Sequence, residues 1–176
     1  MTTQLLIAGF GGQGILFAGK FLATAALIEG RQVSWYPSYG PEMRGGTANC
    51  SIIISDEPIG APIVLEPDIL VAMNGPSYAK FADAIKPGGM LLADSSLVRE
   101  KSVREDIKAY YIPATQMATD EDLETLANMI LLGKMLEETN LLAPETVEKA
   151  MALTVPPRKE WLLKHNLRAI AFGRTQ

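Results

Sequence analysis

The stretch "LLIAGFGGQGILFAGK", residues 5–20, joins an apolar run to a helical pattern through a turn rich in glycine. Gly9, Gly11 and Gly14 match the spacing G-x-G-x-x-G, placed after a predicted strand and before a predicted helix. Glycine lets the backbone turn tightly, and the unpaired N–H groups that begin a helix attract anions. The stretch therefore predicts a strand–turn–helix unit with an anion site formed by Gly9, Gly11, Gly12, Gln13 and Gly14.

Short apolar runs alternate with helical patterns along the rest of the chain, which is typical of an α/β fold. Strands are predicted at residues 4–8, 32–35, 48–55, 69–73, 90–93 and 108–112. Helices are predicted at 14–29, 77–85, 118–139, 144–153 and 158–172, the third beginning with a capping-box pattern at Thr119 and Asp122. No repeat or linker divides the chain. We therefore expect a single domain over residues 1–176, with a Rossmann-like, mostly parallel sheet and helices on both faces.

The complete NAD fingerprint needs an acidic residue at the end of the second strand, where it binds the ribose hydroxyls. No carboxylate occurs between Glu29 and Glu42, so that residue is missing. Three interpretations of the glycine turn remain open: a site for another anion or a partner, a close-packed turn without a ligand, and an NAD site.

Composition narrows the chemistry further. The 176 residues are 48% hydrophobic with a formal net charge of -4, which gives no electrostatic footprint for nucleic acid or an anionic membrane. No apolar run reaches the roughly 18 residues of a membrane span, and the first residues do not resemble a secretory signal, so a cytoplasmic protein is expected. One cysteine, Cys50, and one histidine, His165, cannot build an iron-sulfur cluster, a multi-cysteine zinc site or a histidine-based triad. Neither catalytic residues nor metal ligands are predicted.

A second loop, "YPSYGPEMRGGTANCSIIIS" at residues 36–55, follows the second predicted strand. Loops that leave the carboxyl ends of parallel strands line the ligand crevice, so Tyr39, Gly40, Glu42 and Arg44 are expected near the glycine turn. Arg44 is the best candidate to bind a phosphate or carboxylate, the alternative being a solvated surface arginine.

Asn74 and Thr115 also follow predicted strands and are candidates for the same crevice, or for hydrogen bonds at turns and helix starts. Asn128 lies within an apolar helical pattern, where an amide is costly unless it is hydrogen-bonded, and it is expected to brace a loop or a neighbouring subunit. Cys50 is expected to be a buried thiol.

Together these segments resemble one family, the gamma subunits of the 2-oxoacid:ferredoxin oxidoreductases. The likeness rests on "GFGGQGILFAGKFLATAA", "YPSYGPEMRGG", "EPDILVAMN", "KPGG" and "ANMILLGKM", which span most of the chain. The sequence of the second loop most resembles that of the 2-oxoglutarate-type gamma subunits.

The resemblance implies a subunit of a heteromeric enzyme that converts a 2-oxoacid, coenzyme A and oxidised ferredoxin to acyl-CoA, CO2 and reduced ferredoxin. Thiamine diphosphate, magnesium and iron-sulfur clusters are then expected on partner subunits, and this chain alone is expected to be inactive. The family's gamma domain has a Rossmann-like fold and helps to enclose coenzyme A, which suits an anion site without a ribose acid. The alternatives are a purely scaffolding subunit and a free-standing NAD-binding module.

Overall fold

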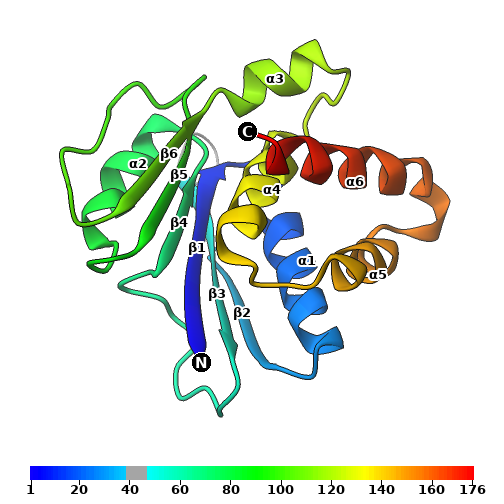
Figure 1. Cartoon of the computed structure of the whole chain (residues 1–176), viewed down its shortest axis with the longest axis horizontal. Coiled ribbons are helices and arrows are strands. Elements are labelled where there is room, and N and C mark those ends of the chain that lie inside the picture. Colours follow the sequence, from blue (N-terminus) through cyan, green and yellow to red (C-terminus); the bar gives the residue numbers. More distant parts are fainter. Residues whose placement is uncertain (39–46) are drawn as a thin grey trace.

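A computed structural model of the chain describes residues 1–38 and 47–176, and its centre is a single sheet (Figure 1). Six strands form this sheet in the order β2-β3-β1-β4-β5-β6. They are β1 (Thr2–Phe10), β2 (Gln32–Ser38), β3 (Thr47–Ser55), β4 (Ile69–Ala72), β5 (Met90–Asp94) and β6 (Lys108–Ile112). All six predicted strands are present, with ends that differ from the prediction by a few residues.

The sheet is mostly parallel, as predicted, with one reversed strand. β1, β4, β5 and β6 pair in parallel, whereas β3 pairs antiparallel with both β1 and β2. β2 therefore runs in the same direction as β1, and five strands present their carboxyl ends at one edge. That edge, which we call the carboxyl edge, is where ligands bind in open α/β sheets.

Helices cover both faces of the sheet, which confirms the predicted layering (Figure 1). One face carries α1 (Ile15–Ile28), α4 (Ala127–Thr139), α5 (Pro144–Thr154) and α6 (Trp161–Arg174). The other carries α2 (Gly75–Phe81), which continues into the short helix η2 (Ala82–Ala84). α3 (Ala114–Asp120) follows β6 at the carboxyl edge, and the short helix η3 (Pro157–Lys159) precedes α6. No helix among residues 1–38 and 47–176 is long and apolar enough to cross a bilayer.

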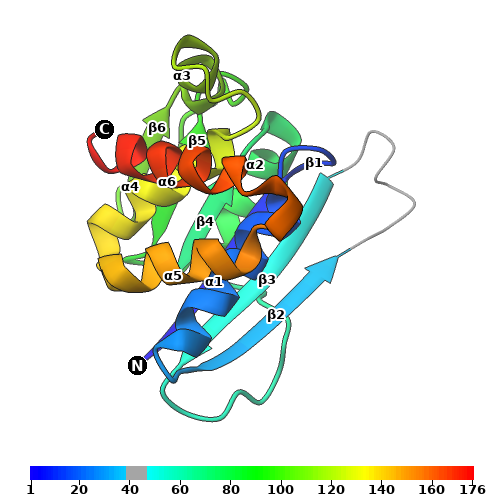
Figure 2. The same ribbon diagram turned by 90° about the vertical axis from the view of Figure 1, so that its right-hand side faces the viewer.

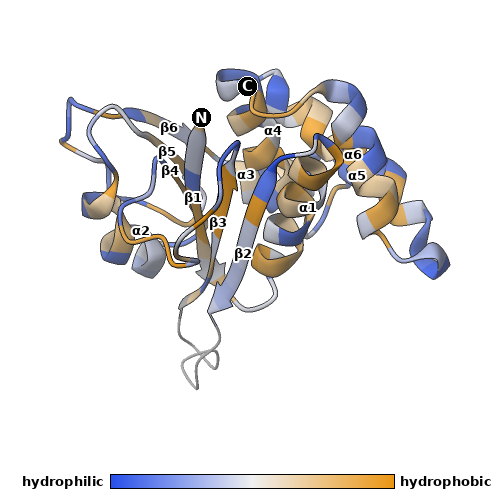
Figure 3. Cartoon of the chain, turned by 90° about the horizontal axis from the view of Figure 1, so that it is seen from below, coloured by the Kyte–Doolittle hydropathy of each residue, from blue (hydrophilic) through white to orange (hydrophobic). Residues whose placement is uncertain are grey.

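The larger helical layer is itself two helices deep, with α5 packed on α1 and α6 on α4 (Figure 2). In Figure 3, α1 and α4 are coloured largely as hydrophobic residues, and hydrophilic residues are more frequent towards the outer helices. This explains why the α1 sequence is apolar on most of its circumference. Its second apolar face is buried mainly by α5 of the same chain.

Local sequence signals account for several helix ends. The Asn74 side chain caps α2 by accepting a hydrogen bond from the Ser77 amide at 2.8 Å, and Pro144 opens α5, where its missing N–H is harmless. Gly30 follows α1 with a φ of 75°, in the left-handed region that glycine favours.

The prediction of one helix over residues 118–139 is wrong. The segment forms the end of α3, an irregular linker, and α4. Thr119 lies inside α3 and donates to the Thr115 carbonyl at 3.2 Å, so it does not cap a helix. Asp122 and Thr125 adopt left-handed φ values of 53° and 70°, which break the helical path without a glycine or proline to mark the break.

Two glycines allow α4 and α6 to approach closely. A Cβ atom on Gly133 would collide with the Ile170 carbonyl oxygen, and one on Gly173 would collide with the Ile130 carbonyl oxygen. Because each collision is with backbone, side-chain rotation cannot relieve it. The close packing of α4 against α6 therefore depends on both glycines.

Candidate functional site

The glycine turn is fastened by the side chain of Gln13. Its Oε1 accepts a hydrogen bond from the Phe10 amide at 2.6 Å, and its Nε2 donates to the Met73 carbonyl at 3.0 Å. A Cβ on Gly9 would lie 2.5 Å from that Oε1 atom, so the first glycine of the motif leaves room for the Gln13 side chain. Gln13 thus joins the end of β1 to the end of β4.

The next two glycines shape the start of α1. Gly12 has a φ of 91°, is exposed, and has open space where a side chain would stand. Gly14 has a φ of 71° and precedes α1, whose N-terminus has no side-chain cap. The first N–H groups of α1 therefore begin beside an open stretch of backbone, an arrangement suited to an anion.

A cleft of about 210 Å³ opens at the carboxyl edge beside this turn. Its walls come from segments far apart in sequence, and most of them follow the carboxyl ends of β1, β4, β5 and β6. The lining consists of Gly12 and Gln13 from the turn, Met73, Leu97, the α3 residues Thr115, Ala118 and Thr119, and Glu124, Thr125 and Ala127 around the linker. The structure thereby brings together three predicted site residues: Gly12, Gln13 and Thr115.

Thr115 is held in place by Asp94, a residue that the sequence did not single out. Asp94 ends β5, is fully buried, and accepts hydrogen bonds from the Thr115 hydroxyl at 2.5 Å and the Thr115 amide at 3.2 Å. It also accepts one from the Ser96 amide at 3.1 Å. The sequence offers a partial signal, because Asp94 directly follows the apolar run "MLLA", and an acid that is buried at such a strand end needs donors around it.

Asn74 is placed differently from Thr115. Its side chain is 1% exposed and does not line the cleft, and its Oδ1 caps α2. The helix-start interpretation of this residue is confirmed, and its role in binding a ligand stays a prediction.

Four predicted site residues, Tyr39, Gly40, Glu42 and Arg44, lie outside the described residues. The residues on either side of them are informative, since Ser38 pairs with Asn49 and Thr47 pairs with Phe10. Both ends of the second loop therefore start from the carboxyl edge, beside the glycine turn, as predicted.

The described cleft lining contains one charged side chain, that of Glu124. The rest of the lining combines glutamine and threonine side chains with apolar ones, and its exposed surface is more apolar than polar. Any attraction for an anion from this wall comes from the backbone of the glycine turn, where Gly12 and Gln13 line the cleft, rather than from a lysine or arginine of the described lining.

A second cleft, of about 280 Å³, lies on the other side of the turn and is mainly apolar. It is lined by Phe10, Gly11, Gly12, Gly14, Ile15, Leu16, Phe17 and Ala48. Gly12 borders both clefts, so the turn separates them, and the second is the more apolar of the two.

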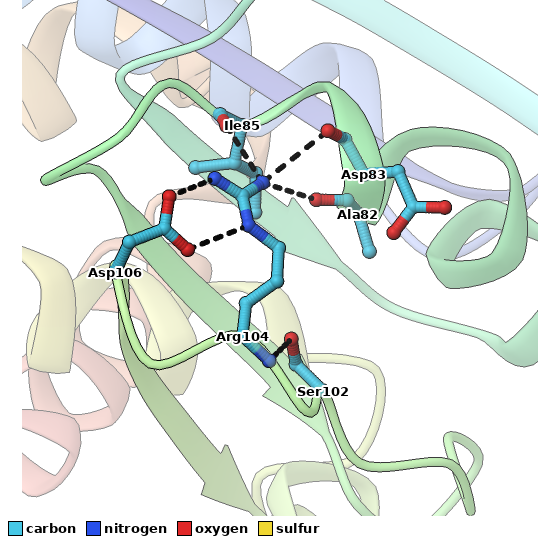
Figure 4. Close-up of polar contacts among 6 residues, drawn as sticks. All are labelled: Ala82, Asp83, Ile85, Ser102, Arg104 and Asp106. Atoms are coloured by element: carbon cyan, nitrogen blue, oxygen red, sulfur yellow. Dashed lines mark hydrogen bonds and ion pairs between the residues drawn. The ribbon is translucent and has the colours of Figure 1, made fainter.

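Arg104 forms a separate polar cluster on the α2 side of the sheet (Figure 4). Its Nη1 donates to the carbonyls of Ala82, Asp83 and Ile85 at 3.4, 3.2 and 2.7 Å, and its Nε and Nη2 pair with Asp106. The carboxylate of Asp106 raises the pKa of Arg104. Because these contacts occupy the guanidinium, this arginine fastens the end of η2 to the segment before β6.

Cys50 is fully buried in β3, as predicted, and its Sγ donates to the Ile15 carbonyl at 3.4 Å. Burial raises the pKa of the thiol to about 12, so it remains protonated at neutral pH. No group of three or more His, Cys, Asp or Glu side chains in the described parts of the chain is arranged to hold a metal ion.

Comparison with known proteins agrees with this architecture. The family model described as pyruvate ferredoxin/flavodoxin oxidoreductase matches residues 4–176. The chain is 41% identical to the 2-oxoglutarate synthase subunit KorC of Methanocaldococcus jannaschii, over 98% of this chain and 92% of the relative. It is 42% identical to the ketoisovalerate oxidoreductase subunit VorA of Methanothermobacter thermautotrophicus, over 97% of this chain and 35% of that longer protein.

Two solved structures share the fold. The gamma subunit of a keto/oxoacid ferredoxin oxidoreductase from Geobacter sulfurreducens matches with a TM-score of 0.82 and 32% identity, over 97% of this chain and 95% of that one. A 2-oxoglutarate:ferredoxin oxidoreductase from Magnetococcus marinus, solved with 2-oxoglutarate, coenzyme A and succinyl-CoA bound, matches with a TM-score of 0.87 and 28% identity. The match covers 99% of this chain and 30% of the Magnetococcus chain, so a domain like this one also occurs within a longer polypeptide.

Proposed function

The chain belongs to the pyruvate ferredoxin/flavodoxin oxidoreductase family as a gamma-type subunit, and from this premise we propose that it forms one wall of the coenzyme A site in a 2-oxoglutarate:ferredoxin oxidoreductase. Its relatives are subunits of oxidoreductases, so other subunits are its partners. The complex would convert 2-oxoglutarate, coenzyme A and oxidised ferredoxin to succinyl-CoA, CO2 and reduced ferredoxin.

The observation that carries the proposal is the cleft at the carboxyl edge, bounded by the glycine turn and α3. Coenzyme A is an elongated, phosphate-rich nucleotide. Exposed backbone at Gly12 offers donors to a phosphate, and the uncapped start of α1 lies across the same turn, where Ile15 lines the second cleft. The mixed threonine and apolar walls suit the sugar and base. The Magnetococcus enzyme, which shares this fold, was solved with coenzyme A bound.

The second loop completes the proposed site. Its ends at Ser38 and Thr47 start from the edge that carries the glycine turn, which supports a position for Arg44 within reach of a phosphate. Tyr39, Gly40 and Glu42 are proposed as its neighbours in the site, and the nearby Asn74 is proposed to contribute indirectly by fixing the start of α2.

The reactive groups are assigned to the partners. A chain with one buried cysteine and one histidine does not supply the thiolate set of an iron-sulfur cluster, so clusters, thiamine diphosphate and magnesium are proposed to reside on other subunits. Ferredoxin would then meet the complex through them.

The test is the Michaelis constant for coenzyme A in the assembled complex. Arg44→Ala should raise it about tenfold or more, because a charge-assisted contact to a phosphate is lost. Arg31→Ala is the matched control, since Arg31 pairs with Asp56 at the opposite edge of the sheet. An unchanged constant for Arg44→Ala would favour a purely scaffolding subunit.

Two further measurements define the activity. The purified chain alone, supplied with thiamine diphosphate, 2-oxoglutarate and an electron acceptor, should show no turnover. Turnover would refute the assignment of the reactive groups to partner subunits. The assembled complex should prefer 2-oxoglutarate over pyruvate, branched and aromatic 2-oxoacids. A preference for ketoisovalerate would instead place the enzyme beside VorA.

A further inference from the structure

Asn128, in the first turn of α4, connects two walls of the cleft although its side chain is 3% exposed. Its Nδ2 donates to the carbonyl of Gly14 at 3.1 Å, across 114 positions of sequence. Its Oδ1 accepts from the amide of Met129 at 2.9 Å, and the same N–H also donates to the carbonyl of Leu126 at 3.0 Å, at the start of α4. One buried amide thus engages the starts of both α1 and α4.

The hydrogen bond from Asn128 holds the last residue of the glycine turn in place. The carbonyl of Gly14 also accepts the Ala18 amide at 3.0 Å, so two donors hold the peptide that opens α1. A Cβ on Gly14 would collide with Nδ2 of Asn128. The last glycine of the motif is therefore required twice, by its left-handed backbone and by the amide that occupies the place of a side chain.

The other end of the connection is the linker between α3 and α4. Asn128 directly follows the linker residues Glu124 and Thr125 and the adjacent Ala127, all of which line the cleft. The left-handed Thr125 lies three residues before Asn128, so the path of the linker depends on where α4 begins. An apolar residue would fill the same space without desolvating an amide, which makes the hydrogen bond to Gly14 the specific contribution of asparagine.

We propose that Asn128 is a positioning residue of the cleft, which sets the spacing between the glycine turn and the linker without touching the ligand. The inference rests on the proposed function, because coenzyme A is the ligand whose binding reports that spacing. Loss of the Asn128 donor would let the two walls separate and weaken binding of coenzyme A, and would leave reaction steps that precede coenzyme A unaffected.

The first experiment uses Asn128→Asp in the assembled complex. Aspartate has nearly the same shape and keeps the acceptor for Met129, but it has no donor for Gly14 and sets an oxygen against the Gly14 carbonyl. The expected result is a rise of about tenfold in the Michaelis constant for coenzyme A, with the constant for the 2-oxoacid and kcat changed less than about twofold.

Asn166→Asp is the matched control, because Asn166 is another buried amide, in α6, whose Nδ2 donates to the Leu162 carbonyl at 2.8 Å. It should lower the melting temperature and leave the Michaelis constant for coenzyme A unchanged. Equal effects of the two variants on that constant would overturn the positioning role.

A double-mutant cycle tests the contact itself by urea unfolding of the full chain. The variants are Gly14→Ala, Asn128→Ala and their combination. Because the new Cβ and the Asn128 amide compete for one place, Gly14→Ala should shift the unfolding midpoint less in the Asn128→Ala background than in the wild type. Additive shifts would overturn the inference.

A variant that fills the cleft, Thr119→Trp, separates this inference from the proposed function. If Thr119→Trp raises the Michaelis constant for coenzyme A and Asn128→Asp does not, the positioning role fails alone. If neither variant changes it, the coenzyme A function fails and the inference fails with it.

Discussion

The side chain of Gln13 donates to the carbonyl of Met73 at 3.0 Å, and this bond ties the glycine turn after β1 to the end of β4. The two residues are 60 positions apart and both line the cleft. The turn is therefore shaped by a neighbouring strand as well as by its glycines. Within the motif, Gln13 has a structural role that the spacing of the glycines alone does not reveal.

Gln13→Glu should destabilise the fold by about 1–3 kcal/mol, because the carboxylate keeps the bond from Phe10 but leaves the Met73 carbonyl without its donor. Urea unfolding measures the change. Gln32→Glu, on an exposed position of the edge strand β2, is the control and should stay close to wild type. Equal stabilities of the two variants would show that the hydrogen bond from Gln13 to Met73 does not stabilise the fold.

Asp94→Asn should loosen the start of α3. The amide retains one acceptor, but its NH2 group would face the donors of Thr115 and Ser96 in a fully buried position. We expect a loss of about 2–4 kcal/mol in the free energy of unfolding, since hydrogen bonds accepted by a fully buried carboxyl group are replaced by an unfavourable donor contact. Hydrogen exchange should rise first in α3, and uniform exchange across the fold would contradict this account.

Gly133→Ala and Gly173→Ala should each destabilise the chain by about 1–3 kcal/mol or more, because the added methyl group meets a backbone carbonyl of the facing helix. Gly75→Ala is the control. Its Cβ would lie 3.8 Å from the Leu97 carbonyl oxygen, an ordinary contact, so that variant should be neutral or slightly stabilising. Thermal unfolding that ranks the three variants equally would refute close packing of α4 and α6.

The stability contributed by Cys50 should depend on pH. Burial raises the pKa of its thiol from 9.0 to about 12, so the folded state holds the proton more tightly than the unfolded chain. That stability is complete below pH 9 and is lost progressively as the pH rises towards 12, by about 1.4 kcal/mol for each unit. The gap in unfolding free energy between wild type and Cys50→Ala should therefore shift by about that amount from pH 8 to pH 10. A constant gap would contradict the buried, protonated thiol.

Much of the fold was predictable because its signals are local. Fully buried strands such as β4 and β5 appear as short apolar runs, and the turn at Gly9–Gly14 identifies the strand–helix junction. The location of the site at the carboxyl edge was also predictable, because parallel strands end at the same edge of a sheet. Two of the predicted residues beyond the turn, Asn74 and Thr115, were correctly placed at that edge.

The parts that sequence could not supply depend on distant contacts. The linker before α4 was hidden because Asp122 and Thr125 adopt left-handed conformations that carry no sequence mark, and so Thr119 and Glu124 were not recognised as cleft residues. Asn128 was recognised as a brace, but its partner Gly14 lies 114 positions away. Tertiary packing, rather than local propensity, decided each of these features.

This chain is proposed to supply a wall of the coenzyme A site, and filling the cleft with Thr119→Trp in the assembled complex tests that role most directly. The Michaelis constant for coenzyme A should rise about tenfold or more, with that for the 2-oxoacid unchanged. Glu57→Trp, which follows β3 at the opposite edge, should change neither constant. An active Thr119→Trp complex with wild-type dependence on coenzyme A would show that this cleft forms no part of the coenzyme A site.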